Sequence, residues 1–144
     1  MPSQEADGTD AEIDDRMLLL MGGGGGATSL LAFTMVGWIV FDDIVYGGIG
    51  GLFAGVGSYL FIPWFVGLSA AQETADTDIS VSDAAERVSR NSRLGVFGFG
   101  LEAGAIVMIV VGILLDGADL LVGVPAALTV ALAAYFVGSV VLGR

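Results

Sequence analysis

The chain has 144 residues, of which 55% are apolar, 15% are charged and 23 are glycine. Soluble domains carry about 25% charged residues, and a chain this apolar has ample surface to bury, so the composition excludes a disordered protein and an ordinary soluble enzyme. Sixteen acids stand against five arginines, a net charge of −11, which makes nucleic acid an unsuitable partner. An integral membrane protein is the class that fits this composition.

Residue types that often carry chemistry are missing. The chain contains no cysteine and no histidine, and none of its five cations is a lysine. Disulfides, thiolate and imidazole metal ligands, haem ligation by histidine and Ser–Lys dyads are therefore unavailable. We expect no catalytic residue, no metal and no cofactor held by this chain alone, and we interpret the protein as a non-enzyme.

The acidic composition has two interpretations. A strongly negative surface attracts cations, and it also keeps a protein hydrated where high salt screens the repulsion between its charges. The absence of lysine, together with abundant aspartate, glycine, alanine and valine, resembles the composition of haloarchaeal proteins. We therefore expect a source cell that is a haloarchaeon or another extreme halophile.

Along the chain, residues 1–16 contain six acids and too little apolar surface to fold alone, so a disordered acidic tail is expected. Four apolar runs follow, each long enough to cross a hydrocarbon core of about 30 Å as a helix. Because the runs are continuous and lack period-two alternation, helices are favoured over strands. The predicted helices cover residues 17–40, 44–68, 95–115 and 120–142.

The short polar turns between these runs predict an all-α integral membrane protein with four transmembrane helices in two antiparallel hairpins, 17–68 and 95–142. Residues 69–94 form a polar linker between them. Within it, Ser80 is a candidate helix N-cap, and apolar residues then recur at helical spacing. We expect a short amphipathic helix over about 81–93 on the membrane surface, with a docking helix for a partner protein as the alternative.

Arginine placement predicts the orientation. All five arginines fall in the three segments that four crossings place on one side of the membrane, and cations near helix ends are retained on the cytoplasmic side. We therefore predict a multi-pass protein of the cell membrane with both termini cytoplasmic. Trp38 and Tyr46 are expected near the outer boundary and Trp64 near the inner one. The expected cytoplasmic anchors are Arg16, Arg87, Arg90, Arg93 and Arg144.

Glu102 is the one charged side chain well inside a predicted helix, about 10 Å past Gly95 at 1.5 Å per residue. A charged acid inside a membrane costs up to roughly 3 kcal/mol, a cost that protonation, a polar partner or a water-filled cavity avoids. Glu102 is therefore a candidate proton- or cation-coupling carboxylate. The alternative is a structural glutamate that is hydrogen-bonded or that reaches toward the membrane surface.

Glycine spacing is the strongest packing signal, because small residues four apart let helices approach closely in lipid. One stripe runs along the second predicted helix, and a pair of glycines flanks Glu102 in the third. The run 22–26 is five consecutive glycines, which indicates either a flexible helix lining a passage or a tolerated low-complexity stretch. The candidate helix-packing residues are Gly47, Gly51, Gly55, Ser58, Gly100 and Gly104.

Two functions fit this sequence. The first is a non-catalytic accessory or scaffold subunit of a larger membrane complex of respiratory or transport type, since polar chemistry is scarce and packing surface is abundant. The alternative is a small oligomeric transporter or channel in which Glu102 is the coupling carboxylate. The expected partners are the lipid bilayer and other membrane-protein subunits or further copies of the chain.

Overall fold

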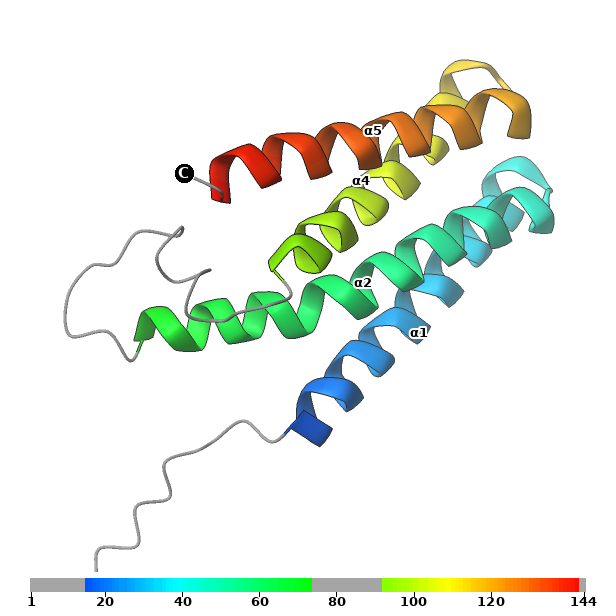
Figure 1. The fold of residues 1–144 in the computed structure, drawn as a ribbon. Helices are drawn as coiled ribbons and strands as arrows, with labels where there is room; N and C mark the ends of the chain where they lie inside the picture. Colours follow the sequence, from blue (N-terminus) through cyan, green and yellow to red (C-terminus); the bar gives the residue numbers. More distant parts are fainter. Residues whose placement is uncertain (1–14, 74–91, 143–144) are drawn as a thin grey trace, which may run out of the picture.

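The computed structural model describes residues 15–73 and 92–142. They form four helices, each long and apolar enough to cross a membrane, which confirms the predicted all-helical class. The helices are α1 (Asp15–Phe41), α2 (Ile44–Glu73), α4 (Ser92–Leu114) and α5 (Leu120–Leu142), as Figure 1 shows. The predicted tail, apart from Asp15 and Arg16, and the predicted amphipathic helix, apart from its last two residues, lie outside the described residues.

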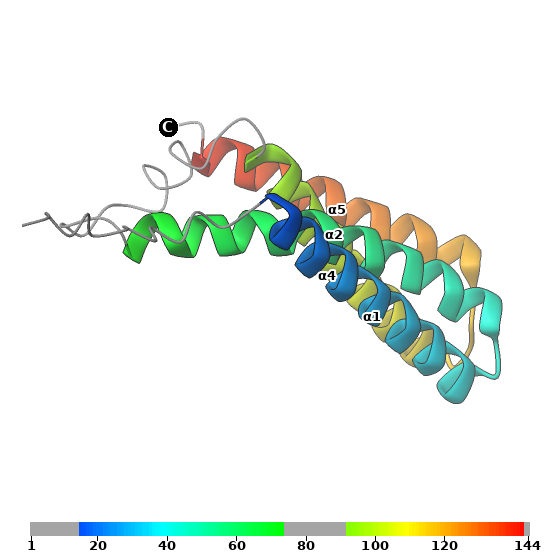
Figure 2. The ribbon, with the colours of Figure 1, turned by 90° about the horizontal axis from the view of Figure 1, so that it is seen from below.

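The four helices lie in chain order in a staggered layer. Helix α2 packs between α1 and α4, and α4 packs between α2 and α5 (Figure 1). Seen from below, α1 and α4 lie on one side of this layer and α2 and α5 on the other (Figure 2). In the most apolar stretches of α2 and α4, 33% and 44% of the residues are buried, against 11% and 17% in α1 and α5. Helices α1 and α5 are therefore the two edges of the layer.

Two turns of similar construction join α1 to α2 and α4 to α5. Each contains an aspartate with positive φ, 54° at Asp42 and 56° at Asp116, a conformation that aspartate tolerates better than most side chains. A second aspartate then caps the next helix. Asp43 Oδ1 accepts hydrogen bonds from two backbone N–H groups of α2, at 2.8 and 2.9 Å, and Asp119 Oδ1 accepts one from α5 at 2.8 Å. The turn acids thus end one helix and start the next.

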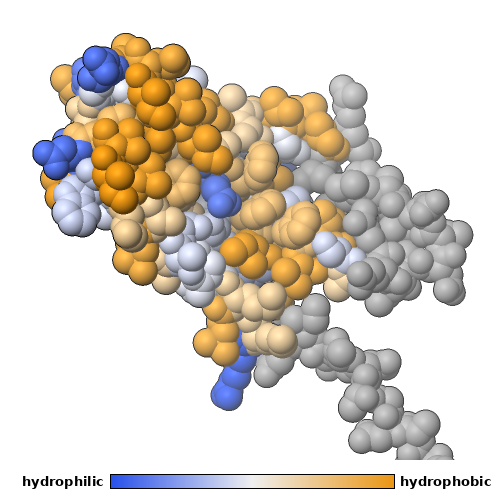
Figure 3. Space-filling model, turned by 180° about the vertical axis from the view of Figure 1, so that it is seen from behind, coloured by the Kyte–Doolittle hydropathy of each residue, from blue (hydrophilic) through white to orange (hydrophobic). Residues whose placement is uncertain are grey.

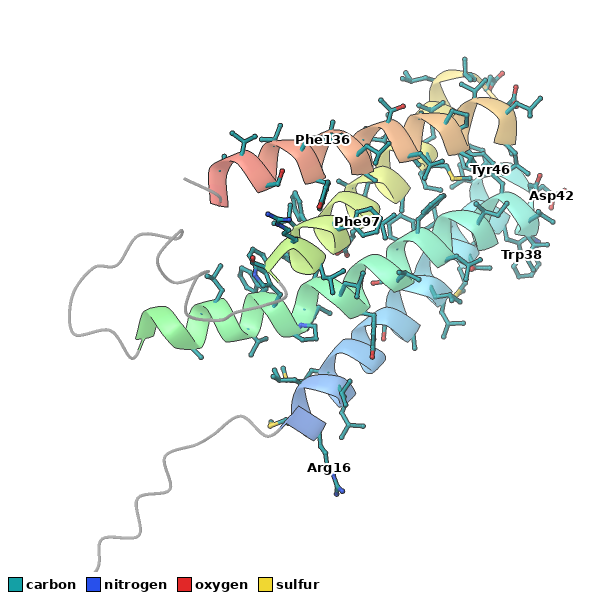
Figure 4. All side chains as sticks on the ribbon, in the orientation of Figure 1. Arg16, Trp38, Asp42, Tyr46, Phe97 and Phe136 are labelled. Carbon is teal, nitrogen blue, oxygen red and sulfur yellow. The ribbon has the colours of Figure 1, made fainter. Side chains whose placement is uncertain are left out.

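Tyr46 is fully buried where α2, α4 and α5 meet near the turns. Its hydroxyl group donates a hydrogen bond to the Met108 carbonyl oxygen, and its ring meets Phe41 edge-on with the centroids 5.1 Å apart. Figure 4 shows Tyr46 directed inward near the end of the layer where Trp38 lies. Trp38 is exposed there, as an aromatic residue at a membrane boundary would be, whereas Tyr46 belongs to the core.

Helices α1 and α2 meet backbone to backbone at glycines. A Cβ atom added at Gly47, Gly51 or Gly55 would lie between 2.5 and 2.9 Å from a carbonyl oxygen of α1, closer than real Cβ contacts, so only hydrogen fits there. The contacts step along the two helices in opposite directions, so α1 and α2 are antiparallel. They pair Gly47 with Thr34, Gly51 with Leu30 and Gly55 with Gly26.

Gly57 makes an equivalent contact on the other side of α2. A Cβ atom there would lie 2.7 Å from the Gly98 carbonyl oxygen and 2.8 Å from the Glu102 amide nitrogen of α4. Because the obstructing atoms are backbone, they cannot swing aside as the end of a flexible side chain can. The contact between α2 and α4 therefore depends on glycine at this position.

Gly57→Ala is expected to lower the free energy of unfolding by about 1–3 kcal/mol, since the added methyl group overfills a backbone contact. Gly23→Ala is the matched control, because a Cβ atom at Gly23 meets nothing within 4 Å. The control should be neutral or should gain up to about 1 kcal/mol from higher helix propensity. Denaturant titration in detergent micelles measures both variants, and equal stability of the two would contradict this packing.

Candidate functional site

Three polar side chains from three helices meet in a continuous hydrogen-bond chain. Ser58 Oγ of α2 donates to Glu102 Oε1 of α4 at 3.1 Å, and the hydroxyl oxygens of Ser58 and Ser29, the latter on α1, lie 2.7 Å apart. A serine hydroxyl group can donate only one hydrogen bond. Because Ser58 donates its hydrogen bond to Glu102, Ser29 is the donor in the bond between the two serines. We call Ser29, Ser58 and Glu102 the serine–glutamate chain.

The serine–glutamate chain lies halfway along the helices. Each of its three residues is within one position of the midpoint of its own helix. Glu102 follows the start of α4 at Ser92 by ten residues, which corresponds to about 15 Å at 1.5 Å per residue. The predicted depth of about 10 Å was counted from Gly95, and α4 begins three residues earlier. The carboxyl group therefore lies in the middle of an apolar layer.

The three side chains differ in exposure. Ser58 is 2% exposed, whereas Ser29 and Glu102 are half-buried. Seen from the side of α1 and α4, hydrophilic atoms mark the two ends of the layer and one small area between them (Figure 3). Among the described residues, Glu102 is the one charged residue away from a helix end. Within residues 15–73 and 92–142, the Glu102 side chain has one hydrogen bond, which Ser58 donates to Oε1. Carboxyl oxygen Oε2 is left without a partner there.

Two glycine contacts bring the neighbouring helices within reach of Ser58. Gly55 holds α1 close through Gly26, and Gly57 holds α4 close through the backbone at Glu102. A serine side chain is short, so it reaches partners on two neighbouring helices only where both helices lie this near. The same local sequence thus provides the close packing and the polar contact.

Other hydroxyl groups in the helices behave differently. Five of them donate to backbone carbonyl oxygens of their own helix, the usual arrangement for serine and threonine in apolar helices. These are Thr28, Thr34, Ser69, Thr129 and Ser139. Spacing along one helix cannot separate these residues from Ser29 and Ser58, whose partners lie on other helices. A shared position at the helix midpoints is the one signal in the sequence that links Ser29, Ser58 and Glu102.

Gly100 and Gly104 flank Glu102 in sequence but face α5. Cβ atoms there would lie 2.7 Å from the Ala131 carbonyl oxygen and 2.5 Å from that of Ala127. These two glycines hold α4 against α5. The glycine that adjoins Glu102 in space is Gly57. Gly57 lies two residues after Gly55 and is therefore not part of the stripe of small residues four apart along α2.

The run of five glycines is continuous helix within α1. Gly22 and Gly26 face α2, where added Cβ atoms would lie 3.0 Å from the Tyr59 carbonyl oxygen and 2.7 Å from that of Gly55. Gly23 and Gly24 face open space on the exposed side. Gly25 also faces α2, where an added Cβ atom would overlap the Ile62 side chain, so the run contributes to packing at three of its positions and leaves a smooth surface at two others.

Of the expected anchors, Arg16 and Arg93 are exposed in the first turns of α1 and α4, at the end of the layer opposite the turns (Figure 4 labels Arg16). Arg87, Arg90 and Arg144 lie outside the described residues. Within residues 15–73 and 92–142, no group of three acidic side chains could hold a metal ion. No family model, no curated protein and no solved structure matches the chain.

Ser58→Ala removes the hydroxyl group common to both bonds and should cost about 0.6–2 kcal/mol of unfolding free energy, the range for hydrogen bonds between membrane helices. Thr28→Ala is the control, because Thr28 donates to Gly24 of its own helix; it should stay within about 0.5 kcal/mol of the unmodified protein. Micelle denaturation of both variants is the measurement. Equal stability of the Ser58→Ala and Thr28→Ala proteins would show that the serine–glutamate chain does not stabilise the packing of the helices.

Proposed function

We propose that the protein is a non-catalytic accessory or scaffold subunit that packs against other membrane proteins in a larger complex of respiratory or transport type. The observation that carries this proposal is the difference between the centre and the edges of the layer. Hydrogen bonds and glycine contacts join the helices at the centre, whereas the two outer helices are largely unburied. The serine–glutamate chain and the glycine contacts join α1, α2 and α4, while α1 and α5 leave most of their apolar residues uncovered.

In this proposal the layer lies in the cell membrane as two antiparallel hairpins, α1 with α2 and α4 with α5, and both termini are cytoplasmic. Arg16 and Arg93 support this orientation, because both begin helices at one end while the turns at the other end carry only acids. The acidic, lysine-free composition supports an extreme halophile as the source. Lipid then takes the place of water around the exposed apolar side chains.

Helix α5 offers the surface for partner subunits. Large exposed side chains recur along it at spacings of four or seven residues, so they share one face. This α5 stripe comprises Leu121, Leu128, Leu132 and Phe136. A regular row of large side chains at an edge can fit into the grooves of a neighbouring membrane helix, which is how helices associate where lipid removes the hydrophobic drive.

A small oligomeric transporter or channel is the second candidate, favoured by the half-exposed carboxyl group of Glu102 at mid-depth. The scaffold is preferred because Oε1 is already bonded to Ser58 and thereby joins helices. In a transporter, Glu102→Gln would abolish proton- or cation-dependent flux in the folded protein. In a scaffold, the variant keeps an oxygen acceptor and leaves assembly intact.

Extraction of the tagged full chain in mild detergent should recover defined partner subunits in fixed proportion. Shortening the α5 stripe with Leu132→Ala and Phe136→Ala should reduce partner recovery severalfold. Leu31→Ala, which shortens an exposed side chain on α1, is the control and should retain the partners. Purification without any partner, or equal recovery from the stripe variant and the control, would contradict the scaffold proposal.

A further inference from the structure

An apolar groove runs between α1 and α4 on the face shown in Figure 3. It has a volume of about 260 Å³, and every side chain that lines it is apolar. We call it the α1/α4 groove. Its lining residues are Ala32, Phe33, Val36, Ile106, Ile109 and Val110.

The serine–glutamate chain lies about one helical turn from the groove on both helices. Ser29 precedes Ala32 by about one turn on α1, and Glu102 precedes Ile106 by about one turn on α4. About one turn beyond one end of the groove, Glu102 therefore has a carboxyl oxygen, Oε2, without a partner within the described residues. The apolar α1/α4 groove and Oε2 of Glu102, a polar atom without a partner, therefore lie close together at the middle of the layer.

In the membrane proposed above, the occupant of this face must offer hydrogen bonding at mid-depth. An acyl chain can fill the apolar trough, but it leaves Oε2 unsatisfied, and water is scarce in the hydrocarbon core. A second copy of this chain could not supply a cation to pair with Glu102 at this depth, because the described helices carry no cation away from their ends. A neutral hydrogen-bonding group at the depth of Glu102 meets the requirement.

We propose that the occupant is a second copy of the chain, packed face to face about a twofold axis normal to the membrane, with the two Glu102 carboxyl groups hydrogen-bonded to each other. Copies inserted with one topology place Glu102 at one depth, so the two groups meet without any vertical shift. A protonated carboxyl group donates its O–H to an oxygen of the other, which makes the pair self-complementary.

The α1 side of this face suits close approach of a second copy. Ser29 and Ala32 are small, and Ile106 of α4 is 52% exposed beside them. In a twofold contact, residues near the axis meet their own counterparts. Ile106, one turn from Glu102, should therefore lie near Ile106 of the other copy. This inference rests on the membrane insertion of the proposed function and not on the partner surface of α5.

The absence of cysteine from the chain permits a direct test by single-cysteine cross-linking. Ile106→Cys in native membranes, oxidised with copper–phenanthroline, should give a disulfide-linked dimer on a denaturing gel. Leu128→Cys is the control, since Leu128 is 43% exposed at a similar depth on α5, away from the groove. We expect a dimer from the first variant and monomer from the second.

Substitution of Glu102 tests the hydrogen bond itself. Glu102→Val in the Ile106→Cys background should weaken dimerisation by about fivefold to thirtyfold in detergent dilution, as expected from one hydrogen bond between membrane helices. Glu102→Gln should preserve it, because two amide groups also donate to and accept from each other.

Monomer from Ile106→Cys, or equal cross-linking of Ile106→Cys and Leu128→Cys, would overturn the dimer, as would a Glu102→Val dimer of unchanged strength. These results leave membrane insertion intact, because each requires a protein that stays in the membrane. Release of the Ile106→Cys protein by alkaline washing would instead remove the proposed function and this inference together.

Discussion

The close approach of three helix backbones at the middle of α2 is the constraint on which the rest of the structure depends. Gly55 admits α1 on one side, and Gly57 admits α4 on the other. Lipid tails are as apolar as leucine, so helices in a membrane gain little from burying apolar surface against each other and rely on packing and polar contacts. Here both kinds of contact fall at the same point, because Ser58 follows Gly57 directly and reaches both neighbours.

As a result, contacts between helices fix the packing at the centre of the layer, whereas the outer helices α1 and α5 are largely uncovered. Glu102 would be costly as an isolated acid among apolar residues, but Ser58 satisfies one of its oxygens and Ser29 extends the chain to a third helix. Helix α5 is joined to α4 by contacts at Gly100 and Gly104 that involve no interhelical hydrogen bond. Large apolar side chains on the edges are then free to meet lipid or protein. The open edges are the basis of the proposed assembly with other membrane proteins.

Much of the fold follows from the apolar runs. The runs locate α1 and α5 to within two residues, because their ends coincide with charged turns or tails. They do less well where a helix continues into polar sequence: α2 extends to Glu73 rather than to residue 68, and α4 begins at Ser92 rather than at residue 95. Hydropathy reports which residues suit lipid, whereas helix hydrogen bonding continues past that limit.

The site could be predicted only in part. Its charge singled out Glu102, and the glycine stripe singled out Ser58, but the contact between them depends on how α2 and α4 are rotated about their axes. Sequence spacing within one helix carries no such information. For the same reason Gly100 and Gly104, adjacent to Glu102 in sequence, face α5 in space. Tyr46 likewise lies near the expected end of its helix but turns inward to Met108.

Retention in the membrane tests the central claim most directly, since the packing, the scaffold and the dimer all assume lipid around these four helices. Vesicles from cells that make the full chain can be washed with alkaline carbonate, which strips proteins that are only bound to the surface. The account predicts that the protein remains entirely in the pellet and leaves it only with detergent. Recovery of the folded protein in the alkaline supernatant would contradict it.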